Sequence, residues 1–198
     1  MKILVTGFEA FNGETINPSE EIIKRLKKSY AGNTVDTVKL PVEFKGAKER
    51  LEEAIHLLKP EAVISLGEAG GRECITFERV AINVNDARIP DNSGYQPVDA
   101  SICEDGPAAY FSTLPIRELM KHLEDKRTVT RISNTAGTYV CNHVMYTALR
   151  LAEQEYRGMK AGFIHVPYMK EQTEGKGEIP SMELEEMVKV IEDIVEFL

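Results

Sequence analysis

Apolar residues occur along the chain in two patterns, short continuous runs and stripes in which every third or fourth residue is apolar. In the first half, the runs at residues 2–6, 35–40 and 62–66 predict strands, because short apolar runs between turn residues are typical of buried strands. The stripes at residues 18–30 and 44–58 predict helices. The elements therefore follow the order strand, helix, strand, helix, strand.

The second half of the chain keeps this alternation. Helical stripes at residues 116–124 and 141–156 alternate with apolar runs at 129–132 and 161–166, and the clearest stripe, at 184–198, predicts a C-terminal helix. Strands that alternate with helices are typical of α/β proteins, in which crossover helices cover a parallel sheet. The pattern predicts an α/β fold with a mostly parallel sheet and the C-terminal helix on one face.

Two segments do not fit this scheme. Residues 85–107 and 167–180 contain several prolines and glycines and have little periodicity. Loops of such length inside compact proteins are usually functional or mobile. We keep two hypotheses for the longer segment, a lid over a site and an interface.

Length, composition and charge restrict the class of protein. The chain has 198 residues, 42% of them hydrophobic, so residues 1–198 are expected to form a single domain with one sizeable core. The 32 acidic and 24 basic residues give a formal net charge of −8, the wrong sign for binding phosphate backbones or anionic lipid. Neither nucleic acid nor a membrane is expected as a partner.

The N-terminus and the cysteines indicate a cytoplasmic protein with a free thiol. The first apolar run ends at Thr6-Gly7, far short of a signal-peptide core or of the roughly 20 residues that span a bilayer. The three cysteines, Cys74, Cys103 and Cys141, are an odd number and form no CxxC pair. This pattern favours neither a disulfide framework nor a thiolate zinc site.

Cys141 is a candidate nucleophile because of its place in the predicted helix. It lies in the first turn, shortly after a turn at Gly137, with Thr138 placed to act as N-cap. Backbone N–H groups and the helix dipole stabilise negative charge at this position, which lowers the pKa of a thiol and creates an anion pocket beside it. The alternative interpretation is a small buried hydrophobe.

His165 is the strongest candidate base among the four histidines. It ends its predicted strand, at the edge where parallel α/β sheets hold active sites, and Cys141 follows a strand-to-helix turn at the same edge. The two side chains are therefore expected to approach each other, although a hydrogen-bonded core histidine is equally compatible with the pattern. His56 and His122 are expected to face solvent, and His143 to point to another side of its helix.

Glu78 is a candidate third member of such a site. It lies in the apolar segment 75–82, where strand alternation places it on one face with Thr76 and Val80. A carboxylate among apolar neighbours needs a partner, and a protonated imidazole would supply one. The alternatives are a basic partner or a solvated position on an edge strand.

Three further features are expected at the same edge. The loop 67–72 is rich in glycine but lacks the Lys-Ser/Thr ending and the GxGxxG spacing of a phosphate loop. It is expected to be a tight loop that exposes backbone groups at the sheet edge, where they could also line a pocket. Phe8 and Phe11 lie just beyond the first strand, where two rings could hold a flat apolar ligand. Both are equally compatible with a role as core aromatics.

Extended motifs carry a resemblance to a known family. The first comprises Gly71-Arg72, ITFERVAIN at residues 75–83 and DARIPDN at 86–92, and the second is ISNTAGTYVCN at 132–142, continuing to Tyr146. Shorter matches are FIHVPY at 163–168 and VTGF at 5–8 with Asn17-Pro18. In these segments, which span nearly the whole chain, the sequence closely resembles the pyroglutamyl peptidase I, or pyrrolidone-carboxylate peptidase, family of cysteine peptidases.

The resemblance implies a fold, an activity and a set of site residues. It implies a three-layer αβα sandwich, commonly a homotetramer, that removes N-terminal pyroglutamyl residues from peptides through a thioester acyl-enzyme without a metal or organic cofactor. It implies Cys141 as nucleophile, His165 as base and Glu78 as the group that orients the base. The implied substrate-binding residues are Phe8, Phe11, Tyr139 and Val140 around the lactam ring, the backbone of Glu68 opposite the ring N–H, and Arg88 near the oxyanion.

The chain departs from the commonest family pattern at three positions, and other functions remain open on the residues alone. Ala10 and Asn12 are often Pro and Gly in the family, and Glu68 is often Gln. The alternatives are a different cysteine amidase or acyltransferase with the same triad, and a binding module for blocked peptides in which Cys141 is structural. A nucleoside phosphorylase-like activity has the fold class in its favour but no motif.

Overall fold

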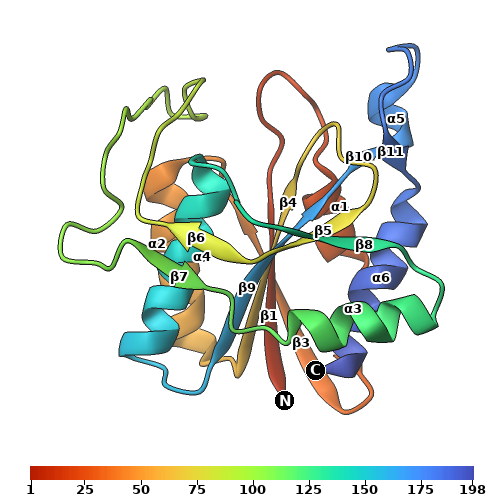
Figure 1. Cartoon of the computed structure of the whole chain (residues 1–198), viewed down its shortest axis with the longest axis horizontal. Coiled ribbons are helices and arrows are strands. Elements are labelled where there is room, and N and C mark those ends of the chain that lie inside the picture. Colours follow the sequence, from red (N-terminus) through yellow and green to blue (C-terminus); the bar gives the residue numbers. More distant parts are fainter.

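A seven-stranded sheet forms the centre of the computed structural model, which describes all 198 residues (Figure 1). The strands are β1 (Lys2–Phe8), β2 (Ser29–Tyr30), β3 (Asn33–Leu40), β4 (Ala62–Glu68), β5 (Ile75–Glu78), β8 (Thr130–Ser133) and β9 (Lys160–Val166). They lie in the order β2-β3-β1-β4-β9-β5-β8. Strands β3, β1, β4 and β9 run parallel, whereas β5 runs antiparallel to β9 and parallel to β8. The sheet is mostly parallel, as predicted. The exceptions are the β9–β5 pair and the short edge strand β2, which runs antiparallel to β3.

Helices cover both faces of this sheet. They are α1 (Pro18–Arg25), α2 (Phe44–Leu58), α3 (Ile116–Asp125), α4 (Val140–Gln154), α5 (Lys170–Thr173) and α6 (Leu184–Phe197). Helices α2 and α4 lie on one face, and α1, α3 and α6 lie on the other (Figure 1). The three-layer αβα sandwich is therefore confirmed. No helix is both long enough and apolar enough to cross a membrane.

Short strands anchor both aperiodic segments. Strand β6 (Val80–Ile82) pairs antiparallel with β7 (Ala109–Phe111), and this ribbon packs on α4. It closes the two ends of the long loop at residues 83–108, which extends beyond the α2–α4 layer in Figure 1. Strand β10 (Tyr168–Met169) pairs with β11 (Ser181–Met182) and so closes the segment that contains α5.

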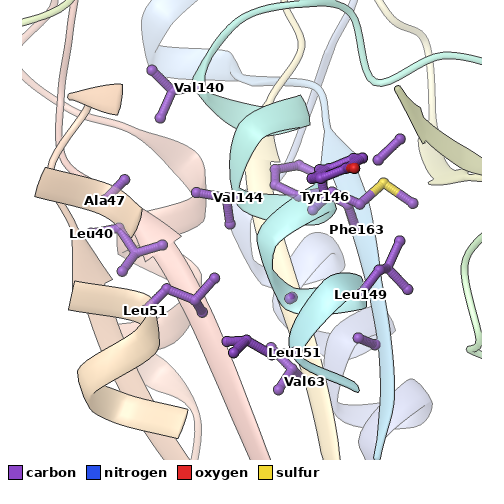
Figure 2. Packing of buried hydrophobic residues seen from close by; sticks show 14 of the residues in the cluster. Leu40, Ala47, Leu51, Val63, Val140, Val144, Tyr146, Leu149, Leu151 and Phe163 are labelled. Atoms are coloured by element: carbon purple, nitrogen blue, oxygen red, sulfur yellow. The ribbon is translucent and has the colours of Figure 1, made fainter. Parts of the chain in front are cut away.

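The sheet divides the core into two hydrophobic clusters, one under each helix layer. The cluster between the sheet, α2 and α4 contains the fully buried rings of Tyr146 and Phe163 (Figure 2). The other cluster lies against α1, α3 and α6. On β1, Leu4 belongs to the first cluster and Val5 to the second. A strand that is covered on both faces reads as a continuous apolar run, which explains the pattern in the sequence.

The first helix is shorter than predicted. Helix α1 ends at Arg25, whereas the helical periodicity continues to about Tyr30. Ser29 and Tyr30 form β2, and Tyr30 is buried with its hydroxyl accepting from the Lys27 N–H (2.6 Å) and donating to Glu192 Oε1 on α6 (3.0 Å). These tertiary contacts outweigh the local periodicity.

The predicted strand at residues 75–82 is interrupted. Strand β5 ends at Glu78, and the Arg79 N–H donates to the Ser133 carbonyl of β8 (2.8 Å) before the chain leaves the sheet to form β6. Glu78 and Val80 therefore belong to different sheets, and the prediction that they share one face of a strand is wrong. The break leaves Glu78 as a fully buried residue at the end of β5.

Candidate active site

One cavity brings together most of the residues that the sequence singles out. It has a volume of about 400 Å³ and lies where β1, β4 and β9 end and α4 begins. Eight of the nine candidate site residues line it, namely Phe8, Phe11, Glu68, Arg88, Tyr139, Val140, Cys141 and His165. The ninth, Glu78, is fully buried and contacts His165.

Cys141 is the second residue of α4, and this helix begins without the predicted cap. Tyr139 occupies the N-cap position and makes no side-chain hydrogen bond to the first turn. The Thr138 hydroxyl instead donates to the Asp86 carbonyl (2.7 Å), and the Asp86 N–H donates to the Thr138 carbonyl (2.9 Å). The prediction of Thr138 as N-cap is therefore wrong, because its hydroxyl ties the start of α4 to the long loop.

Cys141 and His165 line the same cavity, but, contrary to the prediction, the strand that precedes Cys141 does not end at the same edge as the strand of His165. Strand β8 runs opposite to β9, and residues 134–139 carry the chain from β8 to the start of α4. Gly67 on β4 is paired with His165 on β9. A Cβ added to Gly67 would lie 3.0 Å from Cys141 Sγ and 2.7 Å from the Phe163 ring. The missing side chain of Gly67 therefore makes room for the thiol beside the strand of His165.

The acidity of the Cys141 thiol is opposite to the sequence prediction. Burial raises the pKa of the thiol to about 12, and the negative charges of Glu78 and Glu68 act in the same direction. The prediction of a lowered pKa is wrong, because desolvation in this pocket outweighs the effect of the helix start. At neutral pH Cys141 is therefore a protonated thiol, which would need a base to act as a nucleophile.

His165 and Glu78 form a buried hydrogen-bonded pair. His165 Nδ1 lies 2.7 Å from Glu78 Oε1, and the two residues are 5% and 0% exposed. Burial lowers the pKa of His165, which leaves the ring neutral at neutral pH. Burial acts to raise the pKa of Glu78, but hydrogen bonds from His165, Ser133 and Arg72 outweigh it and hold that pKa below its usual value. An ionised Glu78 accepts the Nδ1 proton, so Nε2 is the nitrogen left to accept a proton from a thiol.

Arg72 is a second partner of Glu78. The sequence left open whether the partner is an imidazole or a basic side chain, and Glu78 contacts both. Arg72 Nη1 donates to Glu78 Oε1 (2.7 Å) and to Thr76 Oγ1. No role was predicted for Arg72 from the sequence. A signal was available, because a basic residue in a loop at the sheet edge lies six positions before a carboxylate that needs charge compensation.

Aromatic and aliphatic side chains form one wall of the cavity. Phe8 is buried with its ring centroid 6.3 Å from that of Phe163. The Phe11 ring lies 6.4 Å from Tyr139, whose hydroxyl donates to the Pro90 carbonyl (3.1 Å). Phe8, Phe11 and Tyr139 give the cavity that contains Cys141 an apolar wall.

Polar side chains occupy the remainder of the cavity wall. Glu68 Oε2 accepts from Gln172 Nε2 (2.7 Å), and burial raises the pKa of Glu68. Arg88 is exposed on the long loop. Tyr168 also lines the cavity and was missed as a site residue, although it lies two positions after β9 ends; a Cβ on Gly70 would collide with its ring.

The other histidines lie outside the cavity. His56 is exposed, as predicted, whereas His122 is half-buried against Phe197 with its Nε2 inaccessible to solvent, so the prediction that it faces solvent is wrong. His143 is buried and its Nδ1 lies 3.0 Å from Asn85 Oδ1. His165 is therefore the imidazole available to Cys141.

The arrangement is suited to nucleophilic acyl transfer. A protonated thiol, a neutral imidazole and an ionised carboxylate provide a nucleophile, a general base and a group that orients the base. The thiol lies at a helix start, where backbone N–H groups are available to stabilise an oxyanion.

Comparisons with known proteins agree over the whole chain. A family model described as pyroglutamyl peptidase matches residues 1–197. A pyrrolidone-carboxylate peptidase of Clostridium perfringens (strain SM101 / Type A) is 48% identical over 192 residues, which cover 97% of this chain and 90% of the relative. A pyrrolidone-carboxylate peptidase of Thermoanaerobacter sp. (strain X514) is 48% identical over 198 residues, covering 100% and 98%.

Solved structures agree as well. Pyroglutamyl peptidase I of Bacillus amyloliquefaciens superposes with a TM-score of 0.95 at 41% identity and covers 98% of this chain and 95% of its own. Pyrrolidone carboxyl peptidase of Thermococcus litoralis superposes with a TM-score of 0.94 at 46% identity, covering 98% and 91%.

Proposed function

Because the chain belongs to the pyroglutamyl peptidase family, we propose that Cys141, His165 and Glu78 carry out the family's reaction. The chain is a cysteine peptidase, a hydrolase that removes N-terminal pyroglutamate from peptides. The observation that supports the triad is that Cys141 and a His165 held by Glu78 line the same cavity. We further propose that residues 1–198 act as one catalytic domain.

The first half of the reaction acylates the enzyme. His165 Nε2 takes the proton of the Cys141 thiol as Sγ attacks the pyroglutamyl carbonyl carbon, because the high thiol pKa requires proton transfer during attack. N–H groups at the start of α4, with Arg88 nearby, stabilise the tetrahedral oxyanion. The C–N bond then breaks, and the imidazolium gives its proton to the leaving amine. A thioester remains on Cys141.

The second half of the reaction releases pyroglutamate. His165 takes a proton from water as the water oxygen attacks the thioester carbonyl, and the proton returns to the thiol when the C–S bond breaks. Glu78 keeps the proton of the neutral ring on Nδ1 and stabilises the imidazolium that forms in each half. No metal or organic cofactor enters either step.

The walls of the cavity fit a flat, uncharged lactam. Phe8, Phe11, Tyr139 and Val140 form the apolar side around the ring, and the backbone of Glu68 faces the ring N–H. A blocked amino terminus carries no ammonium group, so apolar contact and a few hydrogen bonds are sufficient for recognition. The Glu68 contact uses the backbone, so it is unaffected by the difference from the common Gln.

The partners and the assembly are part of the same proposal. The substrates are peptides with N-terminal pyroglutamate, in the cytoplasm, and the net charge of −8 disfavours nucleic acid and anionic membranes as partners. By family resemblance the enzyme is a homotetramer. Light scattering is expected to give four times the mass of one chain, and a monomer mass would contradict the assembly without affecting the chemistry.

The decisive experiment compares three chromogenic amides with three forms of the enzyme. Pyroglutamyl, alanyl and prolyl amides are incubated under reducing conditions with wild type, Cys141→Ser and Cys103→Ser. Cys103 is a half-buried free thiol outside the cavity and provides a matched control. We expect cleavage of the pyroglutamyl amide alone, retained in Cys103→Ser and lost in Cys141→Ser. Equal cleavage of another amide would favour a different cysteine amidase, and activity in Cys141→Ser would exclude the proposed nucleophile.

A further inference from the structure

We propose that Arg72 is a positioning residue for the reaction, which fixes the Glu78 carboxylate under His165 and keeps the His165–Glu78 pair from taking up a second proton. Arg72 belongs to the loop between β4 and β5, and it is absent from the cavity wall. It therefore lies away from the substrate and acts through Glu78 and His165, while its charge also acts to lower the pKa of the Cys141 thiol. This inference deepens the proposed function and rests on it.

The contacts of Arg72 converge on the oxygen that His165 uses. Arg72 Nη1 and His165 Nδ1 both lie 2.7 Å from Glu78 Oε1. The same Nη1 donates to Thr76 Oγ1, two positions before Glu78 on β5, and Nη2 lies 3.5 Å from Ser133 Oγ on β8. The guanidinium thus fixes the carboxylate with respect to two strands.

Glu78 depends on the Arg72 contact because its other ion-pair partner, His165, is charged only when it is protonated. The Glu78 side chain is 0% exposed, and its second oxygen, Oε2, is buried with no hydrogen-bond partner. A buried carboxylate with one donor removed is strongly destabilised in its charged form. The Arg72 side chain is 28% exposed, so it lies between the carboxylate and solvent.

The charge of Arg72 also affects the pKa of His165. The charged groups that act on His165 are Glu78 on β5 and Arg72 in the loop. The other charged or titratable residues that line the cavity with His165 are Glu68, Asp86, Arg88, Tyr139, Cys141 and Tyr168. Burial is the largest cause that lowers the pKa of His165, and the charge of Arg72 lowers it further, whereas Glu78 raises it. Without Arg72, the His165–Glu78 pair binds a proton more tightly, and less of the neutral base is present at a given pH.

The test uses three variants. Arg72→Gln removes the charge, Arg72→Lys keeps it, and Arg131→Gln is the matched control. Arg131 lies on β8 next to β5 with 65% of its side chain exposed, and it pairs with Glu73 rather than with Glu78. Each variant is assayed with the pyroglutamyl amide over a range of pH, with folding checked by circular dichroism.

We expect Arg72→Gln to lower kcat by about tenfold or more with KM within about twofold of wild type, because a charge-assisted hydrogen bond is lost away from the substrate. The acid limb of kcat/KM should move to higher pH. Arg72→Lys should restore the position of the acid limb and part of kcat, and Arg131→Gln should match wild type. A purely structural role would lower stability and leave the acid limb unchanged in all variants, which would overturn the proposal.

A second measurement separates this inference from the proposed function. The chain has four histidines, so the His165 ring signal can be followed by NMR and assigned by its loss in His165→Asn. The pKa of His165 should be higher in Arg72→Gln than in wild type and close to wild type in Arg72→Lys. An unchanged pKa in Arg72→Gln would overturn the role of Arg72 even with Cys141→Ser inactive. Activity retained in Cys141→Ser would instead overturn the proposed nucleophile, while the titration still tests Arg72.

Discussion

The three proposed catalytic side chains differ in exposure, and the order follows their roles. Glu78 is 0% exposed, His165 is 5% exposed and Cys141 is half-buried at the cavity wall. Cys141, which would contact the substrate, is the most accessible of the three, and Glu78, which would only orient the base, is fully buried. Burial leaves both the thiol and the imidazole neutral at rest, so the charge separation arises only as the thiol attacks.

Phe11 offers a test of lactam recognition at the residue scale. Phe11→Ala removes a ring from the cavity wall beside Tyr139. We expect KM for the pyroglutamyl amide to rise about tenfold, the effect of losing roughly 1.4 kcal/mol of apolar contact, with a smaller change in kcat. Phe111→Ala, which removes a 68% exposed ring outside the cavity, is the control. Equal KM values in the two variants would contradict the role of Phe11.

Single residues of the site could be found from the sequence, but their chemistry could not. A helix start singles out Cys141, a strand end singles out His165, and a carboxylate in an apolar segment singles out Glu78. The pKa direction of Cys141 depends on its burial beside Gly67 and Phe163, which no local pattern reports. Arg72 was missed for a related reason, since its contact with Glu78 depends on how the β4–β5 loop folds back.

At the scale of elements, the long loop supplies a cap for α2. The N-cap residue Glu43 makes no side-chain cap bond, and the Phe44 N–H donates to Asp91 Oδ2 (3.0 Å). The other oxygen, Asp91 Oδ1, accepts the N–H groups of Ser93 and Tyr95 (both 2.9 Å). One carboxylate therefore joins a helix start to a loop turn, and the loop carries Arg88 into the cavity.

Asp91→Ala should loosen the loop. The loss of the cap and the turn should lower the free energy of unfolding by about 1–2 kcal/mol and speed limited trypsin cleavage after the exposed Arg88. Denaturant unfolding and mass spectrometry of the fragments measure the two effects. Asp105→Ala changes an exposed carboxylate in the same loop and should behave as wild type. Unchanged cleavage in Asp91→Ala would show that other contacts hold the loop.

Asn142 joins α4 to the ribbon of β6. Its fully buried amide accepts from the Ile82 N–H (2.9 Å) and donates to the carbonyls of Ile82 (2.9 Å) and Val84 (3.0 Å). Asn142→Ala should lower the free energy of unfolding by about 3 kcal/mol, because three backbone groups lose their partner. Denaturant unfolding, with the exposed Asn134→Ala as control, measures it. A loss no larger than in the control would refute this account.

Elements were predictable where the apolar pattern is long and undisturbed. The stripes of α2 and α6 and the runs of β4 and β9 match the structure within two residues. Predictions failed where a distant contact decides the conformation. Tyr30 lies in β2 and not in the predicted helix, and the strand predicted at residues 75–82 ends at Glu78.

At the scale of the whole molecule, His143 links stability to pH. Burial lowers the pKa of His143 to about 4, so the folded state stays neutral while the unfolded state takes up a proton near the ordinary value of 6.5. Between these two values the unfolded state binds more protons, and stability falls as the pH falls.

His143→Gln should weaken this dependence. The loss of unfolding free energy between pH 6.5 and 4 should be smaller than in wild type by up to about 3 kcal/mol, although the variant is less stable at neutral pH. Denaturant unfolding at several pH values measures the slope. His56→Gln alters an exposed ring and should keep the wild-type slope. Equal slopes in wild type and His143→Gln would refute the assignment.

The reversal of β5 against β9 has a consequence for the chemistry of the acid (Figure 1). Across this pair, His165 stands opposite Thr76, whereas Glu78 stands opposite Phe163, two positions farther from the rim. If β5 ran parallel to β9, a carboxylate at the carboxyl end of β5 would lie at the edge of the sheet where the cavity opens, and it would contact water. Strand direction therefore sets the dielectric surroundings of the carboxylate, and with them the strength of its hold on the imidazole. The topology of the sheet thus affects the chemistry of the site. It places the carboxylate of Glu78 away from water and His165, on the neighbouring strand, closer to the cavity.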